Sequence, residues 1–138
     1  MTDPSITLQT AIRAMLTAHS VVSALVPADH IRAGSTRPDK LPCIILANPQ
    51  TIHLGRTAGG QFLTRVYMDL HVWALEDGAD MARQIGAAAA VALWDSPVPV
   101  QDTSEYERPN FRYIRDPDPE RAYCHGVASV GCVLRWQV

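Results

Sequence analysis

The sequence predicts an α+β fold, a mostly antiparallel β-sheet with two α-helices packed on one face. Apolar residues recur at helical spacing in two stretches, while several other stretches are rich in strand-forming residues. One of the two helices lies between strands late in the chain, and the remaining links are short and hairpin-like. A length of 138 residues suits one hydrophobic core, so we expect a single domain covering residues 1–138.

The helices are expected at residues 5–18 and 78–94, where apolar residues fall mostly on one stripe. A short extra turn, VVSALV, follows the first helix and stops at Pro27, which cannot continue a helix. Asp77 is a candidate N-cap for the second helix. Its many alanines would allow helix and sheet to approach closely.

The strands are bounded by proline, glycine and charged residues. The predicted strands are DHIRAG (29–34), PCIILAN (42–48), residues 62–75, SEYERPNFRYIRD (104–116, broken or bulged at Pro109) and RAYCHGVASVGCVLRWQ (121–137). PCIILAN is continuously apolar, as is typical of a strand buried on both faces. The glycine-rich residues 53–61 are expected to form the most flexible loop, and DPDPE (116–120) a turn.

The stretch LTRVYMDLHVWA, residues 63–74, alternates between two kinds of side chain. Its even-numbered residues form a nearly apolar row, which we expect to face the helices. The odd-numbered residues form a second row, which we call the polar–aromatic row: Arg65, Tyr67, Asp69, His71 and Trp73. Because successive strand side chains point to opposite faces, this row lies on the side of the sheet away from the helices.

Composition argues against several classes of function. Apolar residues make up 47% of the chain and charged residues 19%, with a formal net charge of −2. No basic cluster is present to neutralise phosphates, so specific nucleic-acid binding is not expected. No run of 18 apolar residues predicts a membrane span, and MTDPSITLQTAI lacks the features of a secretory signal. Three well-separated cysteines indicate buried reduced thiols.

No catalytic, cofactor-binding or metal-binding motif is found. Cys124 and His125 are adjacent on a strand and so point to opposite faces, and neither C-x-x-C nor H-E-x-x-H occurs. The glycines of residues 55–60 do not lead into a helix that could hold phosphate. No G-x-S-x-G is present, and the acidic residues of 116–120 are explained by the turn. We therefore expect no metal, no cofactor and no enzymatic activity.

The polar–aromatic row is better explained as a subunit contact. Tyrosine and tryptophan on an outer face expose large apolar area, which a monomer rarely leaves bare. Tyrosine, tryptophan and arginine are also enriched at protein–protein interfaces. If the last strand lies beside residues 62–75, then Tyr123, His125 and Arg135 extend the same surface. A solvated strand face with cross-strand ion pairs is the simpler alternative.

Several long stretches, taken in order, carry a resemblance to a known family. These stretches are LQTAIRAMLTAHSVVSALV, HIRAG, PCIILAN, LTRVYMDLHVWALEDGADMARQIGAAAAVAL and AYCHGVASVGCVLRW. Together they resemble the tail-completion or tail-terminator family of long-tailed phages and its counterparts in gene transfer agents, over residues 6–136. The most specific part is the join from strand to helix, with Val72, Trp73, Gly78, Ala82, Ile85 and Leu93.

This resemblance implies a structural protein of a virion or phage-like particle, assembled in the bacterial cytoplasm. Its subunits would form a homohexameric ring that caps the tail tube, and its partners would be the tail tube protein and a head-completion or connector protein. DNA would pass through the lumen without specific binding. A ring of this kind needs one patch to meet a different patch on the neighbour, and the polar–aromatic row could supply one of them.

The glycine-rich loop, residues 53–61, is a candidate contact with the tail tube through His53, Leu54 and Arg56, or else a disordered hairpin tip. The acidic turn at residues 116–120 could likewise meet a neighbouring ring. Two other functions stay open. One is a head-side connector or stopper of the neck; the other is a small ligand-binding domain or enzyme with His71, Asp69 and His125 converging in a cleft.

Overall fold

The computed structural model describes residues 2–75, 80–115 and 122–138. Its helical elements are α1 (Pro4–Ala18), α2 (Ser20–Leu25), the 3₁₀ turn η1 (Ala28–His30) and α3 (Met81–Ala92). The strands are β1 (Ile31–Ala33), β2 (Cys43–Arg56), β3 (Phe62–Leu75), β4 (Thr103–Glu107), β5 (Arg112–Arg115) and β6 (Tyr123–Trp136). No helix within these described ranges is long and apolar enough to cross a membrane.

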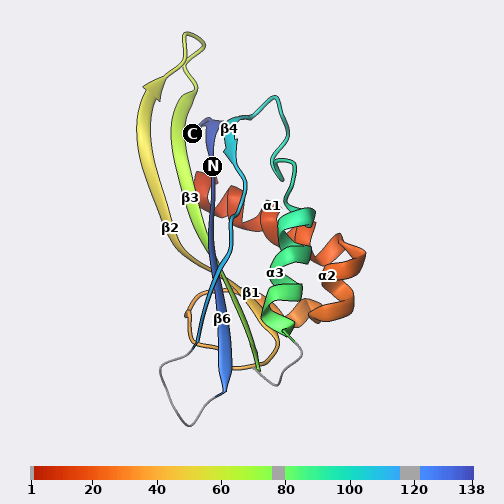
Figure 1. The fold of residues 1–138 in the computed structure, drawn as a ribbon. Coiled ribbons are helices and arrows are strands. Elements are labelled where there is room, and N and C mark those ends of the chain that lie inside the picture. Colours follow the sequence, from red (N-terminus) through yellow and green to blue (C-terminus); the bar gives the residue numbers. More distant parts are fainter. Residues whose placement is uncertain (1, 76–79, 116–121) are drawn as a thin grey trace.

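One six-stranded sheet has the order β1-β2-β3-β6-β4, with β5 also paired to β6. Pairing is antiparallel throughout, except between β1 and β2. The 14-residue strands β2, β3 and β6 run side by side, and β4 and β5 pair with different halves of β6. Figure 1 shows the helices gathered on one side of the sheet. The predicted α+β class is confirmed.

The main core lies between the helices and the apolar rows of β3 and β6. Both Met68 and Leu70 are completely buried there, as the alternation of residues 63–74 predicts. From the helical side, α1 contributes Leu8, Ile12 and Leu16, and α3 contributes Ala82, Ile85 and Ala89. Tyr113 of β5 fills space beside α3, where a Cβ on Gly86 would lie 2.1 Å from its hydroxyl.

The first large difference from the sequence prediction is the length of β2. The apolar run ends at Ala47, yet the strand continues to Arg56, and every residue from Asn48 onward is exposed. The pairing of β2 with β3 shifts register between Ala47 and Gln50 and again between His53 and Gly55. These shifts accommodate Pro49 within the strand and interrupt the regular alternation of its side chains. Residues 53–56 of the expected loop are therefore strand and the loop is confined to residues 57–61, so β2 and β3 form a hairpin that extends well beyond the helices (Figure 1).

Other boundaries follow the sequence more closely. The stretch 104–116 is split into β4 and β5 around Pro109, as predicted. Helix α3 starts at Met81, with Asp80 at its N-cap position and no side-chain cap bond there. The predicted cap Asp77 and the acidic turn at residues 116–120 lie outside the described residues.

Replacing Leu70 tests which face of β3 packs against the helices. Leu70→Ala should lower the free energy of unfolding by about 2–5 kcal/mol, because it leaves a cavity in the main core. Ile52→Ala is the matched control, since Ile52 is 41% exposed on the hairpin and should change stability by less than about 0.5 kcal/mol. Urea denaturation followed by circular dichroism measures both. Equal effects would contradict the assigned orientation of β3.

Candidate interaction surface

The polar–aromatic row lies on the face of the sheet opposite the helices, which we call the outer face. The pairing of β3 with β6 places Trp73 opposite His125, Leu75 opposite Tyr123 and Leu63 opposite Arg135. The last strand is thus a neighbour of β3, and the residues predicted on it share the outer face with the row. The row itself, however, is divided into a covered end and an open end.

At the covered end the chain buries its own aromatic residues. Trp73 is 4% exposed, stacks on His125 with ring centroids 3.9 Å apart, and meets Tyr123 edge-on. It forms a second, small core with the buried Cys43, Ile45 and Ala47 and the partly buried Leu41 and Tyr123. The guanidinium of Arg37 lies 5.3 Å from the Trp73 ring. The expectation that Trp73 is left exposed for another subunit is therefore wrong for the side chain itself, because residues of 34–42 cover it.

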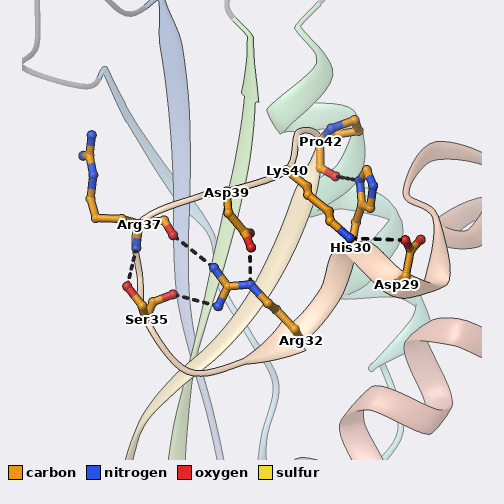
Figure 2. Close-up of polar contacts among 8 residues, drawn as sticks. All are labelled: Asp29, His30, Arg32, Ser35, Arg37, Asp39, Lys40 and Pro42. Atoms are coloured by element: carbon orange, nitrogen blue, oxygen red, sulfur yellow. Dashed lines mark hydrogen bonds and ion pairs between the residues drawn. The ribbon is translucent and has the colours of Figure 1, made fainter.

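Arg32 holds the covering segment 34–42 in place (Figure 2). Its guanidinium donates to the carbonyl oxygens of Ser35 (3.1 Å) and Arg37 (3.0 Å) and to the Asp39 carboxylate (3.2 Å). At the far end of the segment, a ring nitrogen of His30 lies 2.8 Å from the Pro42 carbonyl oxygen. One side chain thus fixes several backbone groups of a segment that has no strand or helix of its own.

His71 lies next to Trp73 and is 8% exposed. Its Nδ1 is 2.7 Å from Nε2 of His125, so one ring donates and the other accepts. The rings also stack, with centroids 4.9 Å apart. Burial lowers the pKa of His71 below its ordinary value of 6.5, opposed in part by the Asp69 carboxylate. His71 is therefore suited to the neutral state.

At the open end, Arg65, Tyr67 and Asp69 are partly exposed. Arg65 forms an ion pair with Glu105 across β6, and Asp69 accepts a hydrogen bond from Asn48 Nδ2 (3.1 Å). Tyr67 lies flat over β6, where a Cβ on Gly131 would be 2.6 Å from its ring. These contacts fix the three side chains while leaving part of each accessible. This end of the outer face is a preformed surface.

The projecting hairpin is supported by an aromatic cluster on its helix-side face. Thr64 is completely buried, and its Oγ1 lies 2.9 Å from Trp136 Nε1 and 3.0 Å from His53 Nδ1. Phe62 packs on Trp136, and Arg56 lies over Phe62 at 4.9 Å from the ring centroid. Of the predicted tube-contact residues, His53 and Arg56 thus have partners within the subunit.

Leu54, the third predicted tube-contact residue, is 50% exposed, and Ile52 beside it is 41% exposed. The sequence pattern alone does not indicate Ile52, Thr64 or Trp136. Their places follow only from the strand register, which sets His53 opposite Thr64, Ile52 opposite Arg65 and Trp136 opposite Phe62.

The arrangement offers little to a reaction. His71 and His125 do meet, but the Asp69 carboxylate accepts a hydrogen bond from Asn48 Nδ2, and the His71 ring is buried beside Trp73. Within the described residues, no group of three or more histidine, cysteine, aspartate or glutamate side chains could hold a metal ion. Cys43 and Cys132 are buried thiols, and burial raises the pKa of Cys43 to about 11.

Comparison with known proteins identifies the family. The family model described as Tail completion protein gp17 matches residues 10–134. The chain belongs to this family. It is a structural tail-completion, or tail-terminator, protein of a virion or phage-like particle, which confirms the expectation from the resemblance.

Two solved structures share the fold of this tail-completion protein. One belongs to the virion of a native gene transfer agent particle, with a TM-score of 0.62, 19% identity, and coverage of 93% of this chain and 94% of that chain. The other is the gp17 protein of bacteriophage SPP1, with a TM-score of 0.61, 18% identity, and coverage of 95% and 91% respectively. A sequence search of curated proteins finds no match.

Trp73→Ala should destabilise the subunit itself. Removing a buried ring from the second core is expected to lower the free energy of unfolding by about 3–5 kcal/mol. Arg65→Glu is the control: it breaks a partly exposed ion pair and should cost at most about 1 kcal/mol. Guanidinium denaturation distinguishes them. If Trp73→Ala were as mild as Arg65→Glu, segment 34–42 would not cover the outer face.

Acidification should also destabilise the subunit through His71. Its pKa is lower in the folded than in the unfolded chain, so the stabilising contribution is complete above about pH 6.5 and declines as the pH falls below that value. The His71→Leu variant should show a flatter fall in melting temperature between about pH 7 and 5. Asp69→Asn removes the carboxylate that raises the pKa of His71, so its fall should be at least as steep as that of the wild type. A slope unchanged by His71→Leu would contradict this assignment.

Proposed function

We propose that copies of this chain close into a homohexameric ring on the last layer of the tail tube, end its growth and present the surface to which the head docks. The match to the tail-completion family over residues 10–134 carries this proposal, because it takes in both the helices and the long strands. DNA passes through the ring without specific binding, consistent with a net charge of −2 and no basic cluster. The protein acts by assembly and catalyses no reaction.

The open end of the outer face is the proposed subunit interface. Arg65, Tyr67 and Asp69 supply partly exposed polar and aromatic groups already fixed in position, so little side-chain entropy is lost on contact. Arg135 lies at the same end of the sheet, opposite Leu63. The remaining predicted residues, His71, Trp73, Tyr123 and His125, support this surface from the covered end and are not its main contacts.

The tip of the β2–β3 hairpin is the proposed contact with the tail tube protein. It projects beyond the helices, and Leu54 offers an exposed apolar side chain there (Figure 1). His53 and Arg56 brace the hairpin through Thr64 and Phe62, so they hold Leu54 in place as well as lining the contact. A braced arm can enter a site on another ring without first being ordered.

Removing the gene from the bacterium that makes the particle tests the proposed function. Without the protein, heads and tails should accumulate separately, with tails of uncontrolled length, in electron micrographs of the lysate. The wild-type gene should restore joined particles. Leu54→Asp should fail to do so although it folds, whereas Val100→Asp, at an 85% exposed position outside the hairpin, should restore them.

Two outcomes would contradict the proposal. Joined particles of normal length in the absence of the protein would exclude a terminator role. Tails of normal length, together with heads that fail to retain DNA, would instead favour the head-side connector or stopper.

A further inference from the structure

Both edges of the sheet are open at its hairpin end. β1 pairs with Ile44–Leu46 of β2, and among the described residues the rest of β2 is paired with β3 alone. On the opposite side, β4 pairs with β6 through Thr103, Ser104 and Glu107, and no other strand of the described part of the chain lies outside it. This end therefore consists of β2-β3-β6-β4, with a strand edge on each side. Such edges present backbone donors and acceptors that can pair with another chain.

The two edges carry opposite charge. From Asn48 to Arg56, the β2 edge contains one cation, Arg56, and no carboxylate. Residues 102–107, by contrast, contain Asp102 and Glu107, together with Glu105, whose charge is already paired with Arg65, and no basic residue. Pairing two β2 edges or two β4 edges would bring like charges together, whereas pairing β2 with β4 brings opposite charges together.

Neither edge can form a long, regular hydrogen-bond ladder with another strand. Pro49 lacks a backbone donor, β2 has two register shifts, and Glu105 interrupts β4 with a positive φ of 50°. These features limit any shared ladder to a few residues. Backbone pairing alone would then be weak, and the charge difference would decide which edge meets which.

We propose that the β2 edge of one copy pairs with the β4 edge of the next, so that the sheet continues from subunit to subunit. This inference rests on the proposed ring and adds two strand edges to the subunit interface proposed for the open end of the outer face. The two edges lie on opposite sides of the same sheet, so one subunit cannot pair them with each other. Repeated β2–β4 pairing is head-to-tail, the type of interface that closes into a ring. It uses backbone groups and edge charges, so the Leu54 side chain stays available to the tail tube.

Charge reversal at each edge, separately and together, tests this pairing. Arg56→Glu makes the β2 edge acidic and Glu107→Arg makes the β4 edge less acidic. Each variant alone should raise the concentration needed for assembly by about fivefold to thirtyfold, measured by sedimentation velocity at low salt. A 1:1 mixture should assemble more readily than either variant alone, because the unaltered basic β2 edge of one then meets the unaltered acidic β4 edge of the other, and the acidic β2 edge meets the less acidic β4 edge. The double variant, which carries both changes in one chain, should assemble more readily than Arg56→Glu alone.

Lys40→Glu is the matched control, because it reverses a charge on segment 34–42, away from both edges. It should assemble like the wild type, and circular dichroism should show that every variant is folded. Three results would overturn the pairing: a wild type that stays monomeric up to about 1 mM, single variants that assemble normally, or a mixture no better than its components. If the gene-deletion experiment succeeds while the mixture fails, the ring forms through other surfaces and the proposed function stands.

Discussion

The pairing of three 14-residue strands, β2, β3 and β6, is the constraint on which the rest of the structure depends. Strand geometry sends alternate side chains of β3 to opposite faces, so covering one face with helices necessarily leaves the other without them. Met68, Leu70 and Val72 take the helix side and are fully buried. Everything on the outer face must then be covered by some other part of the chain or left for another molecule.

The protein combines these two solutions along a single strand. Hydrogen bonds from Arg32 hold segment 34–42 over one end of the outer face, where Trp73 and His71 are buried. Burial there has a cost, because Trp73 Nε1 and His71 Nε2 have no hydrogen-bond partner within the described residues. The apolar contacts of Trp73 with Cys43, Ile45 and Leu41 offset that cost. Segment 34–42 does not continue toward the hairpin. There Tyr67 packs over β6, which is possible only because Gly131 has no side chain.

These features explain which parts of the fold could be predicted from sequence. The orientation of β3 could be predicted because alternation is a local property of residues 63–74. The burial of Trp73 could not, because it depends on a segment about 30 residues earlier that has no periodic pattern and is held by one arginine. The outer half of β2 was missed for the opposite reason: it is exposed on both faces, so no apolar alternation marks residues 49–56 as a strand.

The same reasoning limits where a partner can bind. A stretch of strand exposed on both faces buries little of its own apolar surface, so its order has to come from its neighbour β3 and from the packing of Phe62, Trp136 and His53 near its tip. These residues brace an arm whose apolar Ile52 and Leu54 point away from the subunit's own core. A chain of 138 residues has limited core to support such an extension, and the interaction that stabilises it is most simply supplied by the assembled particle.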